Sequence, residues 1–165
     1  MAQGLVLPGW AITLLDELGY TWPDADEVRM MLIGQEWQDF QSKLNEVAEA
    51  AQKAAESVWT KNSDKAIDQF KQAWSKSGEA IDTLRKDAEG VAFVGVVILI
   101  CAAAVLILKI LVIVQLVILA KTIAAAVAAA PETFGASLLI IPLVKYAIGL
   151  AIDMLIDLAL EALVG

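Results

Sequence analysis

Few side chains in this 165-residue sequence are suited to chemistry, and the best placed of them are carboxylates. Asp153, Asp157 and Glu161 follow one another every four residues, which puts three carboxylates on one face of a helix. Paired carboxylates serve as general acid and base, or bind a divalent cation. Histidine is absent, however, and no glycine-rich loop or second element accompanies these acids. We therefore predict no catalytic residue, no metal site and no cofactor, and a protein that is not an enzyme.

The acidic stripe has two interpretations. In an assembly of several copies, Asp153, Asp157 and Glu161 would line a cation-conducting pore. Alternatively, the stripe is the solvated face of a helix that packs on its neighbour. The second interpretation is favoured because residues 137–144, which precede the stripe, are almost entirely apolar.

The other reactive side chain and the net charge exclude further classes of function. Cys101, the single cysteine, lies in an apolar run with no base or cation close in sequence, so we interpret it as a small apolar residue. The net charge of −8 offers little attraction to a phosphate backbone. We expect neither nucleic acid nor a small-molecule substrate as a partner.

The charge is distributed very unevenly along the chain. Up to Gly90 there are nine basic and 16 acidic residues, but after it only three and four. All five tryptophans also lie before Gly90. The sequence therefore predicts two parts, a water-facing part over residues 1–90 and a hydrophobic part over residues 91–165.

The first part reads as a short helix followed by a helical hairpin. Residues 8–18 predict the short helix, which Gly19 ends. Thr21 is placed to cap the next helix, with Asp24 reaching back to Thr21 and Pro23 in the first turn. Apolar residues then recur at alternating spacings of three and four, a pattern typical of a helical seam. This seam comprises Met30, Ile33, Trp37, Phe40, Leu44, Val47, Ala51, Ala54 and Val58.

A second seam follows turn residues at 61–64. It comprises Ile67, Phe70, Trp74, Ser77, Ile81, Leu84 and Ala88. Two such helices must fold back antiparallel, with a tip near residues 59–63. The large apolar side chains of the hairpin are interpreted either as its core or as a partner-binding patch, because an isolated hairpin leaves half of each seam open. The candidate partner-binding residues are Trp37, Phe40, Trp59, Phe70 and Trp74.

The second part carries two hydrophobic helices. Residues 91–108 are uncharged, and after Lys109 the apolar run continues to Ala120, which is enough for a transmembrane helix. A lysine in mid-bilayer costs roughly 3 kcal/mol. With Val91 at one interface, however, Lys109 reaches the other, so Lys109 and Lys121 are predicted to flank the membrane.

We expect one continuous helix from the second arm of the hairpin to about Ala130, then a turn near Pro131. A last helix is expected over residues 136–163, kinked at Pro142. One copy of the chain is too small to surround two such apolar helices. They are therefore expected to lie in lipid or, alternatively, in the core of a soluble oligomer.

Several segments resemble the WXG superfamily of type VII secretion proteins, and more closely the WXG-like N-terminal domain of actinobacterial polymorphic and channel-forming toxins. They are residues 22–27, Val58-Trp59, the spacing of Ala66, Phe70 and Trp74, and residues 131–137. The resemblance spans about residues 5–160. At the turn, Lys61 stands where the family usually has glycine, and Asn62 is suited to the left-handed conformation in its place. The resemblance implies type VII export and a WXG-type hairpin partner or a second copy of the chain.

Together these observations predict an all-α protein in which a WXG-like antiparallel hairpin precedes a hydrophobic helical hairpin that is long enough to cross a membrane. We expect a non-enzymatic export and membrane-delivery or pore-forming domain of a type VII toxin, with any toxic cargo lying beyond Gly165. The alternative is a structural protein that buries residues 91–165 in a soluble homo- or hetero-oligomer. Because residues 1–10 lack a basic start, we expect export without a cleavable signal peptide, to a secreted or membrane-associated location.

Overall fold

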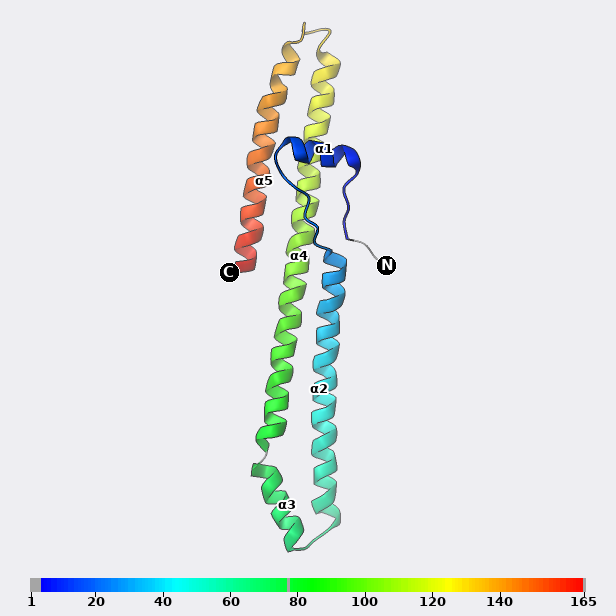
Figure 1. Cartoon of the computed structure of the whole chain (residues 1–165), viewed down its shortest axis with the longest axis vertical. Helices are drawn as coiled ribbons and strands as arrows, with labels where there is room; N and C mark the ends of the chain where they lie inside the picture. Colours follow the sequence, from blue (N-terminus) through cyan, green and yellow to red (C-terminus); the bar gives the residue numbers. More distant parts are fainter. Residues whose placement is uncertain (1–3, 77, 165) are drawn as a thin grey trace. The chain divides into compact units, whose positions relative to one another are not determined.

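The computed structural model describes residues 4–76 and 78–164, and every regular element within them is a helix. The order is α1 (Gly9–Glu17), α2 (Glu27–Lys61), α3 (Lys65–Lys76), α4 (Gly78–Ala129), the short 3-10 helix η1 (Ala136–Leu139) and α5 (Ile140–Val164) (Figure 1). This confirms the predicted all-α class. Where one continuous helix was expected, the structure has α3 and α4, and Ser77 between them lies outside the described residues.

The chain forms two compact units. Unit 1 comprises Met1–Met30 and Ile100–Gly165, and unit 2 comprises Met31–Leu99. This grouping differs from the division at Gly90 that the composition predicts, because the first 30 residues pack within unit 1 together with the apolar helices.

Unit 2 is an antiparallel hairpin in which α2 runs against α3 and the first part of α4 (Figure 1). Its turn lies between Lys61 and Lys65, close to the predicted tip. The Oδ1 atom of Asp64 accepts hydrogen bonds from the backbone N–H groups of Ala66 (2.8 Å) and Ile67 (2.9 Å), which caps α3. The polar turn residues thus end one helix and start the next.

The helices of unit 2 pack through small residues. Gly34, Ala48, Ala55, Ala88 and Gly95 are buried, whereas Phe40 and Val47 are 48% and 58% exposed. The Gln38 amide donates to the Ala92 carbonyl (2.8 Å) across the same interface. On α2 the contact therefore uses small residues beside the predicted seam and leaves Phe40 and Val47 of that seam exposed, whereas Ala88 of the second predicted seam is buried.

Unit 1 is built on the antiparallel pair of α4 and α5, which α1 crosses (Figure 1). The buried core joins residues of all three helices and the segment before α1: Leu7, Ala11, Leu15, Val112, Leu116, Leu119, Ile148 and Ile152. Pro142 lies in the first turn of α5, where its missing N–H leaves no helical hydrogen bond unmade. The geometry changes from 3-10 to α at Ile140, two residues before Pro142.

Much of the apolar surface of α4 and α5 remains open. By length and composition, the stretches Lys65–Ala129 and Ala136–Val164 are able to cross a membrane. Only 17% and 11% of their most apolar windows are buried within the chain. The core helix of a soluble protein is normally buried to a much larger extent.

Candidate functional site

The segment that joins α1 to α2 is extended, although a helix start was predicted within it. Gly19 has a positive φ of 89°, which ends α1, and residues 20–26 run without helical structure to the start of α2 at Glu27. Pro23 disfavours helical geometry in Trp22, the residue before it. The predicted cap at Thr21 was therefore wrong: Asp26 Oδ1 instead accepts the hydrogen bond from the Arg29 N–H (2.9 Å).

This extended course places Glu27 against Lys109 of α4. The Lys109 Nζ and Glu27 Oε2 atoms are 2.8 Å apart, and the two residues are only 2% and 1% exposed. The ammonium also donates to the carbonyls of Ala25 (2.5 Å) and Leu5 (3.4 Å). It lies 5.5 Å from the centre of the Trp22 ring, a favourable cation–π distance. All three protons of the ammonium therefore have an acceptor.

The carboxylate of Glu27 is equally enclosed. Its Oε1 atom accepts a hydrogen bond from the Leu5 N–H, and Gly4 lies so close that an added Cβ would stand 2.7 Å from Oε2. Burial raises the pKa of Glu27, but the hydrogen bonds from Lys109 and Leu5 favour the carboxylate more strongly and hold its pKa below the ordinary value. Glu27 is thus charged at neutral pH.

A buried pair of this kind depends on both partners. Removing one of them leaves an uncompensated buried charge and typically costs about 3–5 kcal/mol, whereas replacing both by apolar groups is often neutral. In the described residues no buried side-chain nitrogen or oxygen lacks a hydrogen-bond partner. The cluster is therefore a satisfied polar site within an apolar helix pair.

A second set of polar contacts joins the same N-terminal region to α5. The hydroxyl of Tyr20 lies 2.7 Å from Asp153 Oδ1 and 2.9 Å from the Gly149 carbonyl oxygen, so its single proton has two acceptors. The hydrogen bond to the Asp153 carboxylate, with burial and the negative charge, raises the pKa of Tyr20 to about 12. Lys145 pairs with Glu17 (2.5 Å) in a partly exposed position. Lys145, Gly149 and Asp153, spaced four residues apart on α5, therefore all contact the N-terminal region.

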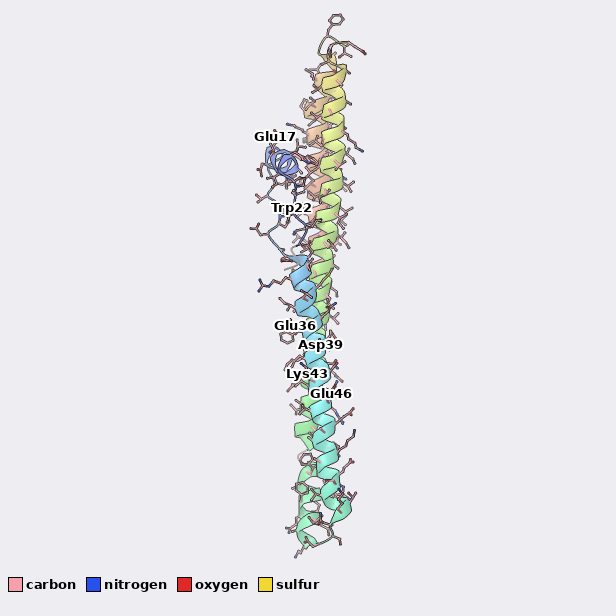
Figure 2. The ribbon with its side chains drawn as sticks, turned by 90° about the vertical axis from the view of Figure 1, so that its right-hand side faces the viewer. Glu17, Trp22, Glu36, Asp39, Lys43 and Glu46 are labelled. Atoms are coloured by element: carbon pink, nitrogen blue, oxygen red, sulfur yellow. The ribbon has the colours of Figure 1, made fainter. Side chains whose placement is uncertain are left out.

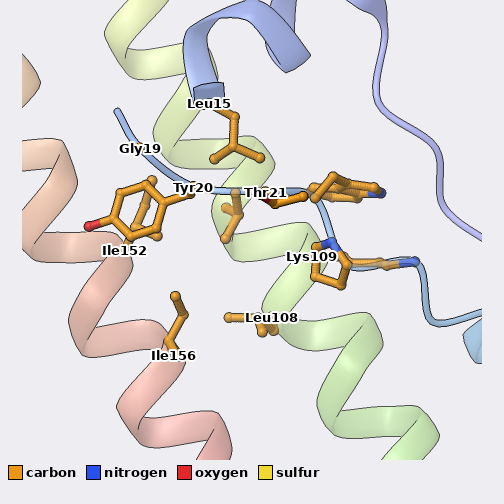
Figure 3. A pocket seen from close by; sticks show the side chains of 11 residues that line it. Leu15, Gly19, Tyr20, Thr21, Leu108, Lys109, Ile152 and Ile156 are labelled. Carbon is orange, nitrogen blue, oxygen red and sulfur yellow. The ribbon is translucent and has the colours of Figure 1, made fainter. Parts of the chain in front are cut away.

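A cavity of about 230 Å³ adjoins the Glu27–Lys109 pair. Figure 3 shows its lining, with Leu15 and Tyr20 from the N-terminal region, Leu108 and Lys109 from α4, and Ile152 from α5. The walls are mainly apolar, and the charged group of Lys109 is already engaged by Glu27 and backbone carbonyls. The cavity thus marks incomplete packing between α4, α5 and the N-terminal segment.

The predicted site residues have separate places in the structure. Asp157 and Glu161 are exposed, and neither they nor the other acids of the described residues form a group able to bind a metal. Lys121 is exposed, whereas Lys109, which the sequence predicts at a membrane boundary, is buried against Glu27. The pore-lining and membrane-flanking roles stay predictions. Sequence reasoning missed the partner of Lys109 because 82 residues separate the pair, although a lone lysine in an apolar helix signals a need for one.

Three of the five predicted partner-binding residues form an aromatic cluster in unit 2. The ring of Phe70 lies 6.0 Å from the rings of both Trp59 and Trp74, and the Trp74 indole donates to Gln52 Oε1 (3.1 Å). Trp37 lies against Gly95. These contacts give the aromatic residues a packing role within the hairpin, and their binding role stays a prediction.

Phe40, the remaining predicted residue, belongs to an open stripe on α2. Helical spacing aligns Ile33, Phe40 and Val47, all exposed, along one line. Figure 2 shows Glu36, Asp39, Lys43 and Glu46 along α2, and the same spacing puts these charges beside the apolar stripe. An apolar stripe with a charged border is the usual anatomy of a helix that binds another helix.

A family model described as the WXG100 like domain matches residues 7–143, which include parts of both units. No curated protein and no solved structure matches the chain.

Proposed function

The chain belongs to the WXG100-like family of helical, type VII secretion-related proteins, and on this premise we propose that it delivers α4 and α5 to a membrane after export. In this proposal it is the non-enzymatic N-terminal part of a type VII toxin. Unit 2 docks a helical-hairpin partner, and the α4–α5 pair then inserts into a bilayer.

The exposed apolar surface of α4 and α5 is the observation that supports membrane delivery. Ile100 and Ile107 of α4, and Leu143, Met154 and Leu158 of α5, are all more than half exposed. A soluble monomer rarely exposes so many large apolar side chains, because each of them loses the roughly 1.5–3 kcal/mol of stabilisation that its burial would give. Lipid provides the missing environment, and both helices exceed the length that a bilayer requires.

The open stripe of Ile33, Phe40 and Val47 supports docking of a hairpin partner. A second hairpin on this stripe would complete a four-helix bundle, and the neighbouring charges would set its orientation. The partner is either a separate WXG-type protein or a second copy of the chain.

Flotation of the full chain with vesicles of phosphatidylcholine and phosphatidylglycerol tests membrane delivery. We expect the chain to float with the vesicles and a Leu143→Asp, Met154→Asp variant to stay at the bottom of the gradient. Both positions are exposed, so the variant should keep the fold. A Glu36→Gln, Asp39→Asn variant on α2 serves as the control and should float normally. A wild-type chain that does not float would overturn the proposal.

The structural alternative also has an observation in its favour. The satisfied Glu27–Lys109 pair allows α4 to carry a charge inside a protein core, as a soluble oligomer would require. Light scattering without detergent distinguishes the two functions. A stable soluble oligomer of defined mass, with no vesicle binding, would support the alternative.

A pore is the finer form of the proposal. Asp157 and Glu161 are exposed on α5, whereas Asp153 accepts a hydrogen bond from Tyr20. All three carboxylates would line a pore only after the contact between Tyr20 and Asp153 breaks. Cation flux across vesicles should then fall when Asp153, Asp157 and Glu161 are replaced by Asn or Gln. Unchanged flux would remove these residues from any conducting path.

A further inference from the structure

We propose that residues 4–27, here named the strap, hold α4 and α5 in a water-stable closed form, and that the Glu27–Lys109 pair must separate before α4 enters a bilayer. This inference rests on the proposed membrane-delivery function and concerns its regulation. In this role the strap controls when α4 enters a membrane, in addition to packing on α4 and α5.

The strap contacts both apolar helices of unit 1. Leu7, Ala11 and Leu15 form a single buried core with Leu116 and Leu119 of α4 and Ile152 of α5. Its polar groups add the contacts of Glu27 with Lys109, Tyr20 with Asp153, and Glu17 with Lys145. The apolar surface that the strap covers would be available to lipid once the strap left.

Lys109 makes the closed and inserted states mutually exclusive. It is the only charged residue from Val91 to Ala120. Among the described residues, every acceptor of its ammonium group, in Leu5, Ala25 and Glu27, belongs to the strap. In a membrane-spanning α4 with Val91 at one interface, residues 91–99 have left α2, and Lys109 lies about 27 Å from Val91, at the opposite headgroup layer. One ammonium is unable to be enclosed by the strap and to contact lipid headgroups at the same time.

The contacts between the strap and α5 oppose release of the strap less strongly than the Glu27–Lys109 pair does. Lys145 and Glu17 have side chains that are 33% and 47% exposed, so water competes with their pairing. Glu27 and Lys109 are shielded from water, and their separation therefore carries the larger cost. The pair should set how readily the closed form opens.

The test compares four forms of the full chain: wild type, Glu27→Gln, Glu27→Gln with Lys109→Met, and Glu36→Gln. Hydrogen exchange reports strap protection, circular dichroism confirms helicity, and dye release from phosphatidylcholine–phosphatidylglycerol vesicles reports membrane entry. Glu27→Gln should lose protection over residues 4–27 and release dye about tenfold faster or more, because it leaves Lys109 unpaired. The double variant has no buried charge left to pair, so it should regain protection of the strap. Glu36→Gln, on the exposed face of α2, should match wild type.

The outcomes separate the inference from the proposed function. Unchanged strap protection in Glu27→Gln would overturn the assigned role of the pair. If Glu27→Gln loses protection but releases dye at the same rate as a wild type that is itself active, the requirement for strap release would be overturned. If every variant leaves vesicles intact and does not bind them, the proposed membrane function fails, and the inference fails with it.

Discussion

Gly34 of α2 and Gly95 of α4 meet backbone to backbone in unit 2. A Cβ added to Gly34 would lie 3.1 Å from the Gly95 carbonyl oxygen, and one added to Gly95 would lie 3.0 Å from the Gly34 carbonyl oxygen. Leu99 and Gln38 crowd the same two positions at 2.7 Å. The two helices therefore approach closely only because both positions lack a side chain.

Substitution of these glycines should weaken the hairpin. Gly34→Ala or Gly95→Ala should destabilise the chain by about 1–3 kcal/mol, because the added methyl group forces backbone as well as side chains apart. Gly90→Ala is the matched control, since nothing lies within 4 Å of its added Cβ. That control should stabilise α4 by up to about 1 kcal/mol. Urea unfolding measures all three, and equal effects at Gly34 and Gly90 would contradict the close packing.

Substitution of Gly4 should destabilise the chain, because Gly4 lies against the Glu27 carboxylate. Gly4→Ala would place a methyl group 2.7 Å from Glu27 Oε2 and 3.2 Å from Asp26 Cα, so the Glu27–Lys109 pair must shift. We expect a loss of about 1–3 kcal/mol in unfolding free energy. Gly9→Ala, which meets nothing within 4 Å, should cost nothing. The prediction fails if thermal melts show both variants to be as stable as wild type.

Tyr20 should lose its phenolic proton only at a pH above the ordinary range for tyrosine. Its pKa of about 12 means that the folded chain keeps the phenolic proton at a pH where the unfolded chain has lost it. The stabilising contribution is thus complete below about pH 10 and is lost as the pH rises to about 12. In a Tyr146→Phe background Tyr20 is the only tyrosine, so the change in ultraviolet absorbance when a phenol ionises reports Tyr20 alone. A midpoint near 10 would show that the contact with Asp153 is absent in solution.

Acid should weaken unit 1 through Glu27. Because its folded pKa is lowered, its contribution is present above the unfolded value near 4.5 and is lost as the pH falls below it. Between pH 7 and pH 3, the unfolding free energy should therefore fall more in wild type than in the Glu27→Gln, Lys109→Met double variant. Parallel pH profiles of the two proteins would contradict an ionised Glu27 in the folded chain.

The local parts of this fold were predictable and the long-range parts were not. Helical periodicity and turn residues located α1, the turn near residue 62 and the all-α class, because these depend on neighbours in sequence. The packing of Gly34 on Gly95 was missed because the periodic pattern was identified from large apolar side chains. A contact between two glycines leaves no trace in such a pattern. Nothing in the local sequence links Glu27 to Lys109, which lies 82 positions away.

Insertion of α4 is the central claim, and the chain provides its own probe in Cys101, the single cysteine. With Val91 at one interface and Lys109 at the other, Cys101 lies about 15 Å deep, near the bilayer centre. An environment-sensitive fluorophore on this cysteine should shift to the blue on addition of vesicles. Lipids with a quencher deep in the acyl chain should quench it more strongly than lipids with a quencher near the headgroup, and more so in Glu27→Gln than in wild type. Emission that stays as in buffer, with no quenching at either depth, would contradict insertion.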